Sequence, residues 1–353
     1  MTMEQARSKQ TPLEQAASGR RGAAAGNPLP VRLFLMIGVL PILLAVALIL
    51  FSLSSPNFFT FINIANVLRQ TSYLTIVALG QMIVMLTAGF DLSVGSTLAV
   101  TSVTSALAMA GVAAAYPDQP WLAIAAGAPV GFLCGLAVGV VNGLGVALLG
   151  VSPFIVTLGM ASVGFCAALY LTSGTPVRGI PYEFADTFGS GGFLGLKAPV
   201  WVALLLAIAV YLLLNWTRLG RHFYAVGGNL KAAALSGIHT RVTLFMAYAI
   251  SAGLTSIAGL LLTARMETGE ANIGTSMPLE SIAACVIAGV SLRGGTGNVV
   301  YVVLGAVFFG VIENGMEVSG VSSYLQIGVT GAILIFAAVA DEFRRRLIGR
   351  SRA

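Results

Sequence analysis

A single carboxylate lies where two long apolar stretches of the sequence meet. Asp91 stands in the run TAGFDLSVGS, after Gly89 and before Ser93 and Gly95. A carboxylate at the centre of a bilayer costs roughly 2.5–3.5 kcal/mol on insertion scales, so such residues face a bundle interior or a water-filled path. We predict a helix break here, with Asp91 as the N-cap that accepts amide hydrogen bonds near Ser93 and Val94. A direct role for this motif in a transport path stays open beside the capping role.

A second group of polar residues lies in a later apolar segment. Glu313 and Glu317 are four residues apart and therefore share one helix face, with Asn314 between them. The spacing resembles the paired acids of a proton relay, but no Lys or His is placed to accompany them. A solvated position near the outer end of the helix is the alternative. Asn314 lies in the run GVIENG (310–315), which is similar to the run GVVNG (139–143) that contains Asn142. Asn142 and Asn314 are further candidate residues of a transport path.

The third feature is a basic central loop, residues 217–243, which contains a short Ala-rich segment bounded by glycines. Asn229 can cap a helix there and Gly237 can end it. A short surface helix with Ala, Leu and Ile on one side is suited to docking into the groove of a partner, although a solvated connecting loop is the alternative. The predicted docking residues are Arg221, Gly227, Gly228, Asn229, Ala232, Ala233 and Gly237.

Other chemistry has little support in the sequence. There is no GxxxxGK[ST] phosphate loop, so the chain should not hydrolyse ATP through one. Cys134, Cys166 and Cys285 lie in apolar segments without a pairing or metal-binding spacing, and the two histidines lie in the basic loop. We therefore expect no catalytic site, no metal site and no cofactor.

The elements that hold these residues are predicted from composition. Of the 353 residues, 57% are hydrophobic and 9% are charged, whereas soluble domains carry about 25% charged residues. We predict an all-α polytopic membrane protein embedded in a lipid bilayer. Its ten apolar segments are residues 33–53, 71–90, 93–112, 121–148, 153–173, 199–216, 244–264, 280–292, 299–318 and 321–340, of which 280–292 is short enough to be a broken or re-entrant helix.

The distribution of charge predicts the topology. Basic residues gather at the N-terminus, in the 217–243 loop and at the C-terminus, which indicates membrane orientation rather than nucleic-acid binding. With both termini in the cytoplasm, only four of the 19 Lys and Arg residues lie outside: Arg69, Arg178, Lys197 and Arg265. Eight or nine helices also fit the hydropathy, but nine would place one basic tail outside. We expect a disordered tail at 1–30, a permease domain at 31–343 and a basic tail at 344–353.

Two pairs of similar segments indicate an internal repeat but disagree on its orientation. Residues 139–143 resemble residues 310–315, and the predicted topology runs these two segments through the membrane in opposite directions, as in an inverted repeat. Residues 88–95 resemble residues 288–295, and these two lie on the same side of the membrane, as in a parallel repeat. Inverted repeats are common in transporters. Chance matching between Gly-rich helices is the alternative.

The sequence resembles the ribose- and xylose-type permeases of ABC importers, within the wider group that includes branched-chain amino acid permeases. The resemblance covers about residues 35–341. It is carried by four runs in order: 87–96 (TAGFDLSVGS), 152–160 (SPFIVTLGM), 220–238, and 282–297. There are two departures: Lys231 stands in a segment that often begins Glu-Ala-Ala, and Glu313 stands where the family commonly has Asn.

The resemblance implies a mechanism and partners. A periplasmic sugar-binding protein would deliver a monosaccharide or polyol to two permease subunits, identical or different, in the bacterial inner membrane. A separate cytoplasmic ABC ATPase subunit would bind the 217–243 loop and drive the change of access. An ion-coupled secondary transporter is the main alternative; a channel or a membrane enzyme has less support, for want of a filter motif or a catalytic set.

Overall fold

The computed structural model describes residues 39–322, 324–333, 335–336 and 339. The predicted tails 1–30 and 344–353 lie outside these residues, as do parts of the first and last predicted apolar segments. The long helices are α4 (Val39–Ser54), α5 (Phe61–Leu86), α6 (Val94–Ala115), α7 (Pro120–Ala147), α8 (Pro153–Thr172), α10 (Ala198–Trp216), α13 (Thr240–Met266) and α15 (Val299–Val318). Shorter helices are α9 (Tyr182–Phe184), the π-helical turn η1 (Ala185–Ser190), α11 (Arg218–Gly228), α12 (Leu230–Leu235), α14 (Met277–Ile287) and Tyr324–Ile333.

Each of the ten predicted apolar segments contains a helix. Among the residues that the structure describes, six helices are long and apolar enough to cross a membrane: α6, α7, α8, α10, α13 and α15. The helical, membrane-protein character is therefore confirmed, while the number of crossings stays a prediction. The predicted start of the second segment is wrong. The helix α5 begins ten residues earlier, at Phe61, because Thr60 caps it by accepting a hydrogen bond from the Asn63 amide.

Two basic residues that we assigned to the outside lie in helices rather than in loops: Arg69 belongs to α5, and Arg265 to the last turn of α13. Glu280, at the start of the predicted segment 280–292, lies in the first turn of α14. Helix ends extend past the apolar run because capped polar turns continue the backbone hydrogen bonding. These side chains consequently come from packed helices rather than from solvated loops.

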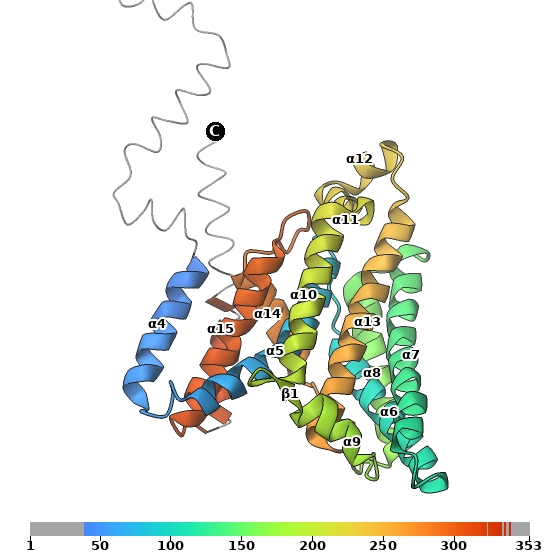
Figure 1. Cartoon of the computed structure of the whole chain (residues 1–353). Helices are drawn as coiled ribbons and strands as arrows, with labels where there is room; N and C mark the ends of the chain where they lie inside the picture. Colours follow the sequence, from blue (N-terminus) through green and yellow to red (C-terminus); the bar gives the residue numbers. More distant parts are fainter. Residues whose placement is uncertain (1–38, 323, 334, 337–338, 340–353) are drawn as a thin grey trace, which may run out of the picture.

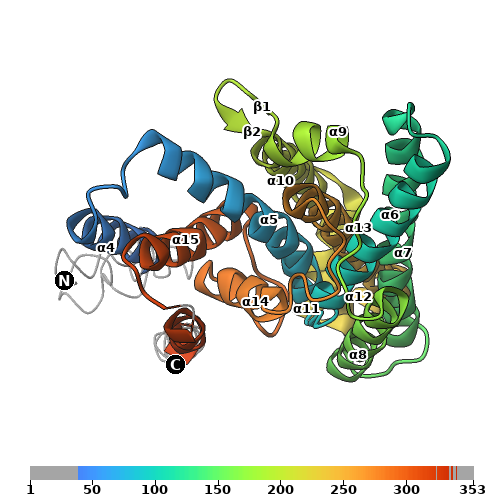
Figure 2. The same cartoon turned by 90° about the horizontal axis from the view of Figure 1, so that it is seen from below.

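Two groups of helices are joined by α5 and α13 (Figure 2). The helices α6, α7 and α8 lie on one side, and α4 and α15 on the other. A stripe of glycines at every fourth position of α7 lets this helix approach its neighbours closely. A Cβ atom at Gly131 would lie 2.8 Å from the Thr101 carbonyl oxygen of α6, and one at Gly139 would lie 2.7 Å from the Tyr248 carbonyl oxygen of α13.

The two ends of the bundle differ (Figure 1). The short helices α11 and α12 lie at one end, and α9 lies at the other with a hairpin of β1 (Gly192–Phe193) and β2 (Leu196–Lys197). Arg178 and Lys197, which the charge distribution assigns to the outside, lie in the connection between α8 and α10 that contains this hairpin. The outward faces between the ends are apolar: on α8, Ile155, Val163 and Tyr170 are all exposed. Such faces are those of a protein surrounded by lipid.

Candidate functional site

The chain breaks between α5 and α6 at the predicted motif. The helix α5 ends at Leu86 and α6 begins at Val94, with Ala88 in the left-handed region at φ 62°. The predicted cap is wrong in detail, because the N-cap of α6 is Ser93 and no side chain caps it. Asp91 accepts the amide hydrogen bond of Ser93, at 2.9 Å, but not that of Val94. Asp side chains commonly accept a hydrogen bond from the backbone amide two residues later, which forms a tight turn. Here this turn uses the Asp91 carboxylate for the Ser93 amide, in place of the amides of the first turn of α6.

Asp91 is enclosed by polar partners from three helices. Its Oδ1 also accepts the Ser93 hydroxyl, at 2.6 Å, and that hydroxyl accepts the Asn142 side-chain amide of α7, at 2.7 Å. Its Oδ2 lies 3.5 Å from the donating Ser251 hydroxyl of α13. With the side-chain amide of Gln81 in the orientation that satisfies its hydrogen bonds, its nitrogen donates to the Asp91 carbonyl oxygen at 3.1 Å and its oxygen accepts the Asp91 amide at 3.2 Å. The structure thus brings Asp91, Ser93 and Asn142 into one buried network.

The two predicted glycines of the motif make close contacts with other elements. A Cβ atom at Gly89 would collide with the Tyr248 hydroxyl of α13, and one at Gly95 would lie 2.7 Å from the Gly274 carbonyl oxygen. Gln81, Tyr248 and Ser251 were not singled out from the sequence. Each of these polar residues lies within an otherwise apolar segment, and that feature of the sequence could have identified them as members of a buried polar network.

The helix α11 rests on this break. Thr217 caps it by accepting the Gly220 amide at 3.1 Å, and Phe223 and Val226 are buried. The Tyr224 hydroxyl donates to the Gly297 carbonyl oxygen at 3.0 Å. Burial raises the pKa of Tyr224, so the hydroxyl keeps the proton that it donates. The amphipathic side of α11 is thereby fixed to the membrane-spanning part.

Gly227, at the end of α11, touches the carboxyl end of α5. A Cβ atom there would collide with the Leu86 carbonyl oxygen and lie 2.6 Å from the Gly295 nitrogen. Gly295 itself donates to Leu86, at 2.9 Å. Three segments far apart in the sequence, ending at 86, 227 and 295, therefore meet at one point. We call this contact, together with the Asp91 network, the inner junction.

The helix α12 projects from the inner junction. The predicted cap and end of this helix are confirmed, because Asn229 accepts the Ala232 amide at 3.0 Å and Gly237 takes φ +83°. Leu235 is 90% exposed, while Ala233 is buried. Of the predicted docking residues, Arg221, Gly228, Asn229, Ala232 and Gly237 are exposed. Their docking role stays a prediction.

Asn314 lies outside the inner junction. It forms a reciprocal amide pair with Asn63 of α5, at 2.8 and 3.0 Å, which fastens the start of α5 to α15. Glu313 does not share a solvated face with Glu317. The structure has Glu317 exposed and Glu313 half-buried, because Glu313 turns toward α5 and accepts the Gln70 amide at 3.5 Å.

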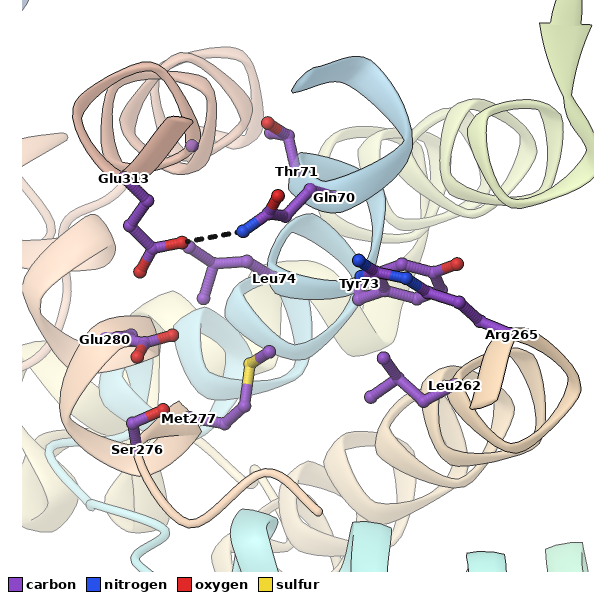
Figure 3. A pocket seen from close by; sticks show the side chains of 11 residues that line it. Gln70, Thr71, Tyr73, Leu74, Leu262, Arg265, Ser276, Met277, Glu280 and Glu313 are labelled. Atoms are coloured by element: carbon purple, nitrogen blue, oxygen red, sulfur yellow. Dashed lines mark hydrogen bonds between the residues drawn. The ribbon is translucent and has the colours of Figure 1, made fainter. Parts of the chain in front are cut away.

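Glu313 faces a cavity of about 230 Å³ between α5, α13, α14 and α15 (Figure 3). Its polar lining includes Gln70, Arg265, Ser276, Glu280 and Glu313. Arg265 and Glu280 lie at the end of α13 and the start of α14, so the cavity is toward the end of the bundle opposite α12. We call it the outer cavity, and the junction at α12 the inner junction, after the sides of the membrane on which the topology predicted from charge places them.

The described part of the chain is a many-helix apolar bundle with a broken span and a capped short helix at one end. Residues 63–338 match the family described as branched-chain amino acid transport system / permease component. The chain belongs to this family, and it is a multi-pass protein of the bacterial inner membrane.

Characterised relatives are similar over most of the chain. The ribose import permease protein RbsC of Escherichia coli strain K12 is 39% identical over 85% of this chain and 92% of that protein. RbsC of Bacillus subtilis strain 168 is 36% identical over 84% and 90%. The galactose/methyl galactoside import permease protein MglC of E. coli K12 is 35% identical over 88% and 95%. No solved structure matches the chain significantly.

Proposed function

We propose that the chain is the membrane-spanning subunit of an ATP-binding-cassette importer that translocates a monosaccharide or related polyol. The observation that carries this proposal is the similarity to import permeases for ribose, for galactose and for D-allose, at 34–39% identity over at least 84% of the chain. In this scheme a periplasmic binding protein delivers the sugar, and a separate cytoplasmic ATPase supplies the energy.

The inner junction supports a route for that energy. The ATPase would dock on α12 through the exposed residues of 217–243, including Leu235. A movement of α12 would displace α11, which directly precedes it in the chain. Because Gly227 of α11 contacts Leu86 and Gly295, the displacement would also move the carboxyl end of α5 and the 294–295 turn. Because Asp91 is bonded to α6 and α13 and its motif continues α5, these helices would shift as one group. Asp91, Ser93 and Asn142 then act as positioning residues.

The topology that we propose has ten membrane helices, with both termini and α12 in the cytoplasm, and two permease subunits, identical or different, around one path. An internal repeat remains part of the proposal, although the echoed asparagines bond differently: Asn142 to Ser93, and Asn314 to Asn63.

The docking step is tested by replacing Gly237 with Asp. The glycine has φ +83°, a conformation that Asp and Asn tolerate better than other non-glycine residues, so the main change is that the new carboxylate opposes the helix dipole. A Cβ atom there meets no other atom, so membrane insertion should be unaffected. In cells lacking the native gene, wild type should restore uptake of one labelled monosaccharide and Gly237→Asp should not. Gly237→Asn is the matched control, because Asn tolerates this conformation.

Full uptake by Gly237→Asp with normal ATPase co-purification would contradict docking at α12. Accumulation of solute by the purified chain alone, in liposomes with an ion gradient, would contradict the importer itself.

A further inference from the structure

The outer cavity has the lining that a sugar requires. Carboxylates accept hydrogen bonds from hydroxyl groups, whereas amide, guanidinium and hydroxyl groups donate to hydroxyl oxygens. Glu280 and Glu313 supply the acceptors, and Gln70, Arg265 and Ser276 supply donors. We propose that this cavity is a transient binding site for one monosaccharide on the translocation path. The proposal rests on the proposed function and adds the site at which the solute is held.

The two carboxylates are kept available to a ligand. Glu280 is 8% exposed and faces the cavity from the first turn of α14. Figure 3 shows Glu280 and Glu313 pointing toward the same space from facing helices. Glu313 accepts one long hydrogen bond, 3.5 Å from Gln70. Ser276 is the side-chain partner of Glu280 and Gln70 that of Glu313. Hydroxyl groups of a solute would satisfy the carboxyl lone pairs that these partners leave open.

The cation of the lining is held away from the carboxylates. Arg265 lies over the Tyr73 ring, with its guanidinium carbon 5.6 Å from the centroid. In the part of the chain that the structure describes, the Arg265 guanidinium has no carboxylate partner. The stacking orders Arg265 on the wall opposite Glu280 and Glu313 (Figure 3), so this donor faces the two acceptors across the cavity.

Other ligands fit this lining less well. A metal ion needs several converging oxygen ligands, and the described residues contain no group of three His, Cys, Asp or Glu placed to hold one. An anion would be repelled by two carboxylates. An apolar solute would leave these polar groups unpaired. Leu74, Leu262 and Met277 add the apolar surface that the C–H face of a sugar needs.

The size of the cavity agrees with a small solute. Its volume of about 230 Å³ is below the range of about 300–1,000 Å³ that holds drug-sized ligands, which leaves room for one monosaccharide. The lining residues of α5 lie 12 to 16 positions before Leu86, about 18–24 Å along the helix from the inner junction. The helix α5 therefore links the place where energy would arrive with the place where the solute would rest.

The test compares Glu280→Gln and Glu313→Gln with Glu317→Gln in proteoliposomes that contain the complete importer. Glu317 lies one turn from Glu313 on α15, is exposed and does not line the cavity, so it is the matched control. Initial uptake and ATP hydrolysis are measured together. We expect uptake to fall about tenfold in the first two variants, the order expected for a lost hydrogen bond to a charged group. ATP hydrolysis and Glu317→Gln uptake should stay near wild type.

Uptake by Glu280→Gln and Glu313→Gln equal to wild type would overturn the cavity site and leave the importer intact. A wild-type complex that imports no monosaccharide would instead contradict the proposed function.

A second measurement decides the case in which the glutamine variants fail to insert. Ser276→Cys, in a chain with Cys134, Cys166 and Cys285 replaced by Ala, is alkylated in the detergent-solubilised permease with ribose, galactose or sodium ions added in turn. Slower alkylation with a monosaccharide supports the proposal. Protection by sodium ions alone, or by none of the three, contradicts it.

Discussion

The carboxyl groups of the inner junction and of the outer cavity differ in how completely protein hydrogen-bond donors enclose them. At the inner junction Asp91 is 1% exposed and accepts bonds of 2.6 and 2.9 Å from Ser93, so its own chain encloses it. At the outer cavity Glu313 accepts one bond of 3.5 Å and faces open space. An enclosed carboxylate fixes backbone geometry, whereas one that faces a cavity is free to bind a solute. The comparison favours a positioning role for Asp91 and a solute-contacting role for the glutamates.

Two helices connect these regions. The helix α13 has 27 residues, about 40 Å, and carries Ser251 of the Asp91 network in its middle and Arg265 of the cavity in its last turn. The helix α5, Phe61–Leu86, carries Gln70 in its first half and Leu86 at its end. A shift imposed at the inner junction would consequently change the shape of the cavity, which is the coupling that an importer needs.

The largest effect is expected from Gly227→Ala compared with Gly228→Ala. The first substitution places a Cβ atom against the Leu86 carbonyl oxygen, whereas the second places it in open space. Overpacking of this kind costs about 1–3 kcal/mol and would displace α11 from α5. We expect ATP-driven uptake to fall to background in Gly227→Ala and to stay near wild type in Gly228→Ala, measured in proteoliposomes at equal protein content. Equal uptake by the two variants would show that the contact between Gly227 and Leu86 does not transmit movement from the ATPase to α5.

A smaller effect is expected from Ser93→Ala. The change removes the hydroxyl between Asp91 and Asn142 and leaves the buried Asn142 amide without this acceptor, at a cost of about 1–3 kcal/mol. The melting temperature in detergent should fall, and uptake should decrease in proportion to the folded protein. Thr104→Ala is the control, because that hydroxyl bonds only within α6, to Val100. Unchanged stability with abolished uptake would indicate that Ser93 contacts the solute instead.

The parts of the site that depend on neighbouring residues could be predicted from the sequence. The Asn229 cap, the Gly237 end and the Ser93–Asp91 hydrogen bond span at most a few positions, so composition and spacing determine them. Family motifs placed the break and the surface helix in the correct order along the chain.

Contacts between distant segments could not be predicted. Nothing in the spacing of residues 86, 227 and 295 indicates that they touch, because the contact depends on how α5, α11 and the 294–295 turn pack. Arg265 was placed outside the membrane-spanning segments because charge usually marks helix ends. Its position in the last turn of α13, and with it the outer cavity, follows from capping and tertiary packing that hydropathy does not report.

The central claim is that α12 is the cytoplasmic docking helix through which a separate ATPase drives the permease. It is tested most directly by labelling Leu235→Cys with an impermeant thiol reagent, in a chain whose three native cysteines are replaced by Ala. Leu235 is 90% exposed, so the new thiol should react readily. The account predicts labelling in inside-out vesicles only, and much slower labelling once the ATPase subunit is bound. Labelling from the outside, or a rate that the bound ATPase leaves unchanged, would contradict it.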